Sequence, residues 1–230
     1  SKDTQRSIEA HKRWLGYLQP DGLVVSAAAL RDKGHYYNEG QRARQIEFSD
    51  HLSASQKYDD EEGTVEITDF KALATGFLEW PEREWVAAAD LGDDFHIQLK
   101  ESRETLTPTA ALRWPRSREL AEGEKPYQLL IWELSAEING KPVDFDTSYE
   151  VIQNTWSTSA TRRMERLLRE TGVPIGLLVS ATALRLIYAP TGENPGSLTF
   201  RFADMLSTMG RPILGAFDLL LGVDMLFLGE

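Results

Sequence analysis

The sequence predicts an α/β domain with one mixed central sheet flanked by helices, and three observations lead to this expectation. Residues 127–134 form an almost wholly apolar run, which is typical of a strand covered on both faces. A basic amphipathic helix is expected over 161–170, because apolar residues recur there at helical spacing and Gly172 follows as a C-cap. Two more apolar strands, over 175–179 and 183–188, come directly afterwards, so the helix connects strands of one sheet.

The composition is that of a globular protein, with 230 residues of which 41% are hydrophobic and 27% are charged. The chain contains no cysteine, which excludes disulfides and thiolate metal sites and fits a reducing cytoplasm. No apolar run has the length of a membrane span and the start has no signal-peptide pattern, so no membrane partner is expected. The absence of an initiator Met and the ending at Glu230 predict a piece of a longer protein.

The N-terminal part, residues 1–90, is predicted to be mainly helical. Its expected elements are a short amphipathic helix (3–15), a buried apolar segment (23–30), a polar helix (36–57), an acidic loop (59–64) and an aromatic-rich helical segment (67–90). In the polar helix the inward positions are expected to be Ile46, Phe48 and Leu52. Pro81 would break or restart the last helical segment.

The core of the predicted domain spans residues 91–205, and an apolar helical segment over 206–230 follows it. The expected core elements are strands over 94–100, 106–114 and 127–134, a polar loop over 135–155, the basic helix, and strands over 175–179, 183–188 and 197–202. The first strand shows period-two alternation, because Phe95, Ile97 and Leu99 alternate with polar residues.

Charge is distributed unevenly along the chain. The net charge of −11 argues against a protein that coats nucleic acid in general. Residues 47–70 hold eight acidic residues against one lysine, whereas residues 159–190 hold five arginines against two glutamates. The arginines of the basic helix are expected to face outward, and the candidates for DNA binding are Arg162, Arg163, Arg166 and Arg169. An ordinary solvated helix is the alternative interpretation.

The predicted order of elements suggests one catalytic fold that the residues can test. A helix, a meander of strands, a crossover helix and another strand form the core of the PD-(D/E)xK nuclease fold. Active members of that fold bind a divalent metal with an Asp on the second strand and with the Glu of a Glu-x-Lys motif on the third. In this sequence Thr109 follows Pro108 at the first place, and Ser135 stands two residues after Glu133 at the second.

These substitutions predict a degenerate nuclease-like domain without a metal site. One carboxylate and one hydroxyl form a poor Mg²⁺ site, so Glu133 is only a weak catalytic candidate and a local ion pair is its preferred role. The four histidines lack metal-ligand spacing, and the Gly-rich stretch 192–196 is predicted to be a hairpin turn. No dinucleotide-binding or phosphate-loop pattern is present. The sequence contains no complete active site.

Three stretches carry a resemblance to a known family. The run over 162–190, together with 192–205 and 210–222, resembles the N-terminal region of SAM-dependent adenine DNA methyltransferases of the type IIG restriction–modification kind, including the methylases of DISARM phage-defence systems. Residues 11–30 are similar to the start of the same family. In that family this region is similar to the N-terminal domain of type I restriction R subunits.

The resemblance implies a bacterial or archaeal defence protein that acts on double-stranded DNA. S-adenosyl-L-methionine would bind in a methyltransferase domain beyond residues 206–230, which would then be a helical linker, and no cofactor is expected in this chain. The sequence lacks the Asn-Pro-Pro-Tyr motif of a methylation site. Further defence-system subunits are possible partners.

Three functions therefore remain open. The first is a non-catalytic nuclease-like domain that helps a larger methyltransferase to engage DNA or a partner. The second is a protein-interaction module of a defence complex. The third is an active Mg²⁺-dependent endonuclease in which Glu133 works with Asp94, Glu101 or Asp146.

Overall fold

The central feature of the fold is a six-stranded mixed sheet, seen in a computed structural model that describes residues 39–55, 64–208 and 210–227. Its strands are β3 (Trp85–Ala87), β6 (Ala110–Arg113), β7 (Tyr127–Glu133), β10 (Ile175–Val179), β11 (Ala183–Tyr188) and β12 (Gly196–Arg201). They lie in the order β12-β11-β10-β7-β6-β3. Only β7 and β10 pair in parallel, and the other neighbours are antiparallel. The expected α/β class with a mixed sheet flanked by helices is confirmed.

The parallel pair is connected by the basic helix, α5 (Ala160–Thr171), because two parallel strands need a crossover. Ser159 caps its N-terminus by accepting a hydrogen bond from the Arg162 amide, 3.2 Å away. Gly172 ends the helix in the left-handed conformation, with φ 74°, and its N–H donates to the Leu168 carbonyl. The predicted helix and the predicted strands β7, β10 and β11 are all confirmed.

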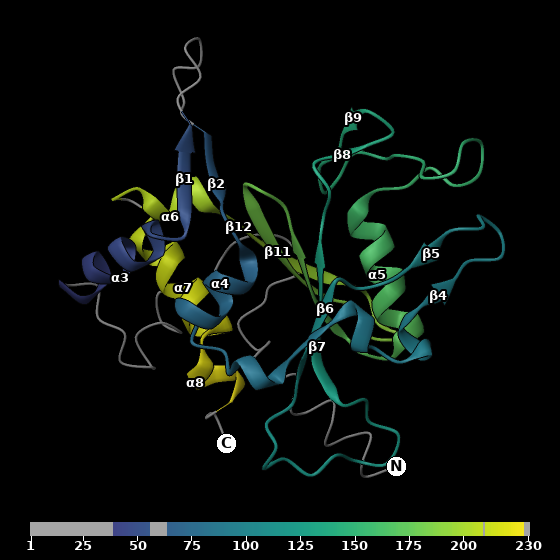
Figure 1. The fold of residues 1–230 in the computed structure, drawn as a ribbon, viewed down its shortest axis with the longest axis horizontal. Helices are drawn as coiled ribbons and strands as arrows, with labels where there is room; N and C mark the ends of the chain where they lie inside the picture. Colours follow the sequence, from purple (N-terminus) through teal and green to yellow (C-terminus); the bar gives the residue numbers. More distant parts are fainter. Residues whose placement is uncertain (1–38, 56–63, 209, 228–230) are drawn as a thin grey trace.

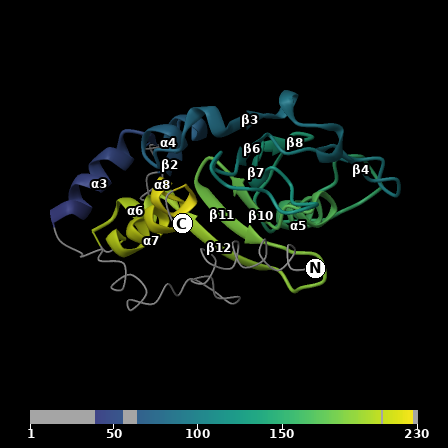
Figure 2. The ribbon, with the colours of Figure 1, turned by 90° about the horizontal axis from the view of Figure 1, so that it is seen from below.

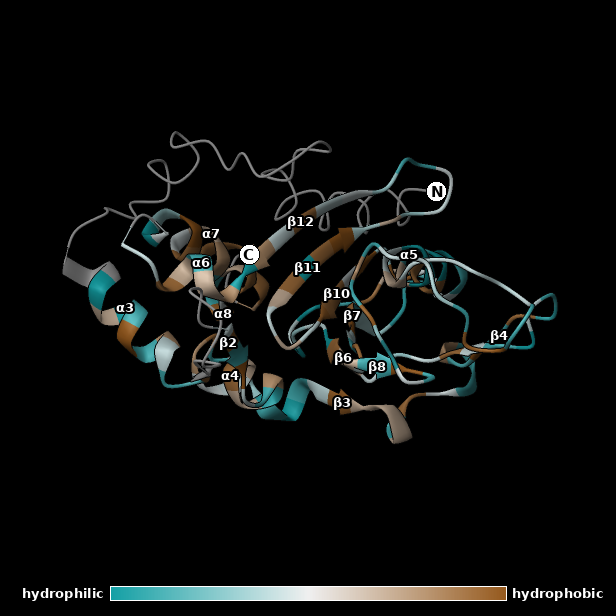
Figure 3. Cartoon of the chain, turned by 90° about the horizontal axis from the view of Figure 1, so that it is seen from above, coloured by the Kyte–Doolittle hydropathy of each residue, from teal (hydrophilic) through white to brown (hydrophobic). Residues whose placement is uncertain are grey.

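Helices cover both faces of the sheet (Figures 1 and 2). Helix α5 packs on one face, and the other face is covered by α4 (Phe70–Gly76), α6 (Phe202–Leu206) and α7 (Arg211–Leu221). Helices α3 (Glu39–Ser49) and α8 (Val223–Leu226) lie next to α7. Strand β10 illustrates the two-sided burial, since Leu177 belongs to the core on the α7 side and Leu178 to the core on the α5 side. Figure 3 shows hydrophobic colour along much of β10 and β11.

In the described ranges, three two-stranded antiparallel pairs lie outside the central sheet. They are β1 (Leu52–Ser55) with β2 (Thr64–Ile67), β4 (Ile97–Gln98) with β5 (Thr105–Leu106), and β8 (Glu137–Ile138) with β9 (Lys141–Pro142). The predicted strand over 94–100 therefore shrinks to β4 and does not join the sheet. Residues 93–95 form a 3-10 turn instead, and Phe95 and Leu99 are buried against Tyr127 and α5. The period-two alternation of this segment therefore reflects burial, and its only pairing among the described residues is the short β4–β5 ladder outside the central sheet.

The helical expectations for the N-terminal part are partly wrong. Helix α3 ends at Ser49, Leu52 belongs to β1, and Ile46 is 59% exposed although Phe48 is fully buried. Within 67–90 the helix α4 is short, and β3 forms the edge of the central sheet between the 3-10 turns Glu82–Glu84 and Ala88–Asp90. Pairing with β6 overrides the local helical pattern there.

Some expectations fall outside the described residues. These are the helix over 3–15, the apolar segment over 23–30 and nearly all of the acidic loop over 59–64. The apolar helices expected after residue 203 are found as α6, α7 and α8. Within the described part of the chain, none of the helices has the length and apolar character needed to cross a membrane.

Candidate functional site

The four arginines of α5 do not form one outward-facing surface. Arg163 is only 1% exposed, which contradicts the expectation that it faces solvent. The buried positions of the helix follow a regular stripe, and they include Ala160, Arg163, Met164, Leu167, Leu168 and Thr171. Arg163 lies at a position in this stripe that would usually hold an apolar residue. It is therefore not accessible for DNA binding.

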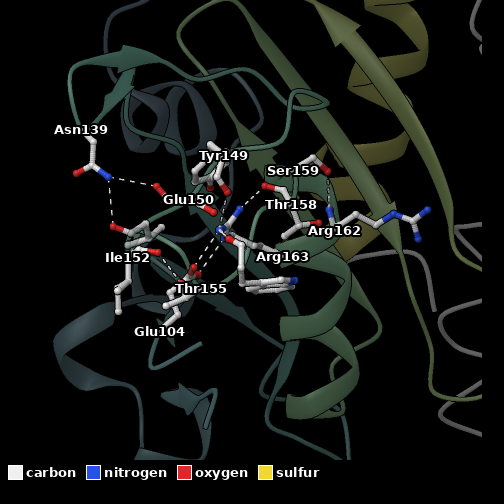
Figure 4. A network of polar contacts seen from close by, with 12 residues as sticks. Glu104, Asn139, Tyr149, Glu150, Ile152, Thr155, Thr158, Ser159, Arg162 and Arg163 are labelled. Carbon is white, nitrogen blue, oxygen red and sulfur yellow. Dashed lines mark hydrogen bonds and ion pairs between the residues drawn. The ribbon is translucent and has the colours of Figure 1, made fainter. Parts of the chain in front are cut away.

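Arg163 instead holds the loop that precedes α5 against the rest of the protein by an ion pair and hydrogen bonds (Figure 4). Its guanidinium forms a two-point ion pair with Glu104, in which both N···O distances are 2.9 Å. It also donates to the backbone carbonyls of Tyr149, Trp156 and Thr158. The guanidinium carbon lies 4.0 Å from the Tyr149 ring centre and 4.9 Å from that of Trp156. The buried charge is thus fully compensated, which makes it structural.

The other three arginines differ in how strongly they are engaged. Arg166 pairs with Glu101, which belongs to the β4–β5 connection, and with Glu170 one helical turn away. The Arg162 side chain is 70% exposed and lies 3.5 Å from Glu165. Arg169 donates to the Glu193 carbonyl and forms no ion pair among the residues that the structure describes. Arg162 and Arg169 therefore remain the two α5 residues with charge available for another molecule.

The nuclease-like motif positions meet where β6 begins and β7 ends. Thr109 precedes β6, and its hydroxyl donates to the Ile131 carbonyl at 3.1 Å and accepts from the Glu133 amide at 2.9 Å. Because these strands are antiparallel neighbours, the residue at the start of one lies beside the end of the other. Thr109 and Glu133 are therefore adjacent, as the motif requires of its two metal ligands, but only one of them is an acid.

A second carboxylate close to Glu133 is Asp69, which the motif analysis did not include. Asp69 is the N-cap of α4 and accepts a hydrogen bond from the Ala72 amide at 3.2 Å. Partial desolvation raises the pKa of Glu133, and the negative charge of Asp69 raises it further. Among the residues that the structure describes, no Lys, Arg or His forms an ion pair with Glu133, so the expected local ion pair is not found there.

The residues at this position do not suit a divalent metal ion. Thr109 supplies a neutral hydroxyl whose proton and lone pair are both engaged by the backbone, and Asp69 is engaged as a helix cap. No group of three His, Cys, Asp or Glu side chains with metal-binding geometry occurs within the described ranges.

The acids proposed to assist Glu133 each pair with a different cation. Asp94 lies 3.8 Å from Lys125, Glu101 pairs with Arg166, and Asp146 lies 2.6 Å from Arg185. Asp146 and Glu101 thus hold loops to β11 and to α5 respectively. The structure does not gather these residues around Glu133.

Comparisons of the chain with family models, with curated proteins and with solved structures found no match.

Proposed function

We propose that this chain is a non-cleaving, nuclease-like domain that helps a larger SAM-dependent adenine DNA methyltransferase to engage double-stranded DNA. The parent enzyme would belong to a restriction–modification or phage-defence system and would act in the cytoplasm. Support comes from the resemblance of residues 162–222 and 11–30 to that family. It also comes from the element order α4, β3, β6, β7, α5, β10, which is the order of the PD-(D/E)xK core.

The observation that carries the proposal is the contact between Thr109 and Glu133. It lies at the junction of the second and third strands of the meander, where an active enzyme of this fold would hold its metal. A hydroxyl in place of the first acid, and Ser135 in place of the lysine, leave one ligand and no amine. The scaffold would therefore position DNA without cutting it.

The cleavage part of the proposal can be tested by rebuilding the motif. We expect the wild-type domain to leave supercoiled plasmid intact in Mg²⁺ or Mn²⁺. The double variant Thr109→Asp, Ser135→Lys should bind Mn²⁺ measurably by calorimetry, because two carboxylates would then be adjacent. The same double variant carrying Glu133→Gln is the matched control and should lose that binding. Plasmid nicking by the wild-type protein that disappears in Glu133→Ala would refute the non-cleaving assignment.

The DNA-engaging part rests on Arg162 and Arg169, which project from one helix without a strong partner. We expect binding to a duplex of about 20 base pairs at low salt, weakening as salt rises by about one unit of log–log slope per phosphate contact. The double variant Arg162→Glu, Arg169→Glu should reduce both the affinity and the slope. The double variant Arg42→Glu, Arg201→Glu is the charge-matched control, because both arginines are exposed and lie on α3 and β12, outside α5. Equal losses in both proteins would show only a general charge effect and would contradict a role for α5.

A protein-interaction module is the second candidate function, and the ion pairing of α5 favours it. Arg163 and Arg166 are neutralised by acids of this chain, and the net charge of −11 opposes general DNA binding. Under this alternative the domain would co-purify with the methyltransferase or with another defence subunit and would show no affinity for the duplex even at low salt.

A further inference from the structure

A cavity lies on the α5 side of the sheet, and its lining includes Thr107 and Trp132 but neither Thr109 nor Glu133. It has a volume of about 270 Å³, is partly open to solvent and is lined by the β5 segment, the end of β7, β8, the loop before α5 and α5 itself. Its apolar lining comes mainly from Leu106, Trp132, Ile138, Val151, Ile152 and Leu167. The volume lies just below the usual range for small-molecule sites, about 300–1,000 Å³.

Two of the three charged side chains that line the cavity are paired with each other, and the third, Arg103, is exposed to solvent and stays hydrated there. Glu104 and Arg163 both line the cavity, but they are paired with each other and almost fully buried. The Arg163 guanidinium also donates to three backbone carbonyls of the loop. A charged ligand would have to displace these contacts or lose its hydration without a partner. The cavity therefore suits a neutral molecule.

One polar atom of the wall has no partner. The hydroxyl oxygen of Tyr149 is buried and forms no hydrogen bond within the described residues. Burial raises the pKa of Tyr149, so the hydroxyl stays protonated at neutral pH and remains a donor. An unsatisfied buried donor carries a desolvation cost that a ligand acceptor would relieve. Arg163 stacks on the Tyr149 ring and limits its movement.

We propose that this cavity binds a small neutral aromatic molecule that carries one hydrogen-bond acceptor, which accepts from the Tyr149 hydroxyl. Aromatic chemistry fits because Trp132 and Tyr149 both present rings to the cavity, and ring pairs gain energy beyond the burial of area. The volume limits the ligand to one ring or two fused rings with short substituents. This site goes beyond DNA engagement, since it is on the opposite side of β7 from Asp69 and requires none of the α5 surface arginines.

The test uses two probes of the same shape, acetophenone and α-methylstyrene, which differ in that a carbonyl oxygen replaces a methylene group. Binding is followed by NMR on the isotope-labelled chain, through the Trp132 indole N–H and the methyl groups of Ile138, Val151 and Ile152. We expect saturable shifts confined to these signals, with acetophenone binding more tightly. In Tyr149→Phe the affinity for acetophenone should fall about 5- to 10-fold, whereas that for α-methylstyrene should change less than 2-fold.

A blocking variant separates the cavity from nonspecific binding. Val151 is 41% exposed and lines the cavity, so Val151→Trp should fill it and abolish the shifts. Leu120→Trp is the matched control, because Leu120 is 46% exposed and lies away from the cavity lining. The proposal is overturned if neither probe saturates at millimolar concentration with the folded wild-type chain. It is also overturned if Tyr149→Phe weakens both probes equally, or if Val151→Trp binds as the wild type does.

Discussion

Replacing Arg163 by methionine tests whether this arginine stabilises the fold from a buried position and does not contact DNA. Methionine keeps much of the length and apolar volume of the side chain but removes the guanidinium. The change leaves the Glu104 carboxylate, which is 4% exposed as a side chain, without its cation. Breaking a buried ion pair from one side typically costs about 3–5 kcal/mol. Since domains of this kind are stable by about 5–15 kcal/mol, the loss is a large fraction of the total.

The structure also predicts how the lost stability divides between the ion pair with Glu104 and the hydrogen bonds to the loop before α5. In the double variant Arg163→Met, Glu104→Leu the buried acid is gone, so part of the stability should return. The carbonyls of Tyr149 and Thr158 keep the backbone hydrogen bonds that pair these two residues, but the Trp156 carbonyl loses the Arg163 donor, and an unsatisfied buried group costs about 1 kcal/mol or more. The double variant should therefore lie between the wild type and Arg163→Met.

Equilibrium unfolding in urea, followed by circular dichroism, measures these free energies. The neighbouring substitution Arg162→Met is the matched control and should change the stability by less than about 0.5 kcal/mol, because that side chain is 70% exposed. Limited proteolysis with chymotrypsin should cut at Tyr149 or Trp156 faster in Arg163→Met. The structural role of Arg163 would be refuted if Arg163→Met lowered the free energy of unfolding by less than about 1 kcal/mol. An equal decrease for Arg162→Met would refute it as well.

Three further predictions concern the ends and the packing of α5 and the acid on β7. Gly172→Ala should cost about 1–2 kcal/mol, because φ is 74° there, whereas Gly92→Ala, with φ −67° and open space around it, should be neutral in thermal unfolding. Gly176→Ala should cost about 1–3 kcal/mol in urea unfolding, because the added methyl would lie 2.3 Å from Met164 Cε and force repacking. Since the folded state raises the pKa of Glu133, ionisation of that group opposes folding above the folded pKa and has no effect below the unfolded one. Glu133→Gln should therefore raise the midpoint of thermal unfolding at pH 7 but not near pH 3.5, and a gain that is independent of pH would contradict the desolvation argument.

The sequence predicts the central elements well because their burial is two-sided and continuous. Strand β7 and the pair β10–β11 are mostly apolar runs, in which Gln128 and Arg185 are the polar exceptions before Glu133 ends β7. Helix α5 has both its capping residues and its apolar stripe in the sequence. Edge elements are harder, because their signals are short. Strand β3 has three residues and is defined by its pairing with β6, which local sequence does not reveal.

The errors at the candidate site have a different physical origin. The expectation that Arg163 faces solvent follows from its charge and ignores its helical phase, because it stands three residues after Ala160 and four before Leu167 in the buried stripe. That phase was a usable signal. The partner of Arg163, Glu104, is 59 residues away in the sequence. Asp69 precedes the strand meander and Glu133 ends β7, so this pair is also distant in the sequence and neither pair leaves a local pattern. Such pairs emerge only from the tertiary fold.

The pairing of α5 limits how much DNA affinity the helix can provide. A phosphate that approached Arg166 would compete with Glu101 and Glu170, so exchange of one partner for another would contribute little net free energy. Arg162 and Arg169 are then the two available contacts, which correspond to a salt slope of about 2 in log–log form, whereas proteins that hold duplex DNA firmly make about 6–10 phosphate contacts. If the proposed function holds, these residues should therefore bind DNA weakly, and firm binding would require basic surfaces outside α5. The salt slope of the wild type would contradict this expectation if it were well above 2 and were lost in Arg162→Glu, Arg169→Glu. That result would show that Arg166 exchanges Glu101 and Glu170 for a phosphate when DNA binds.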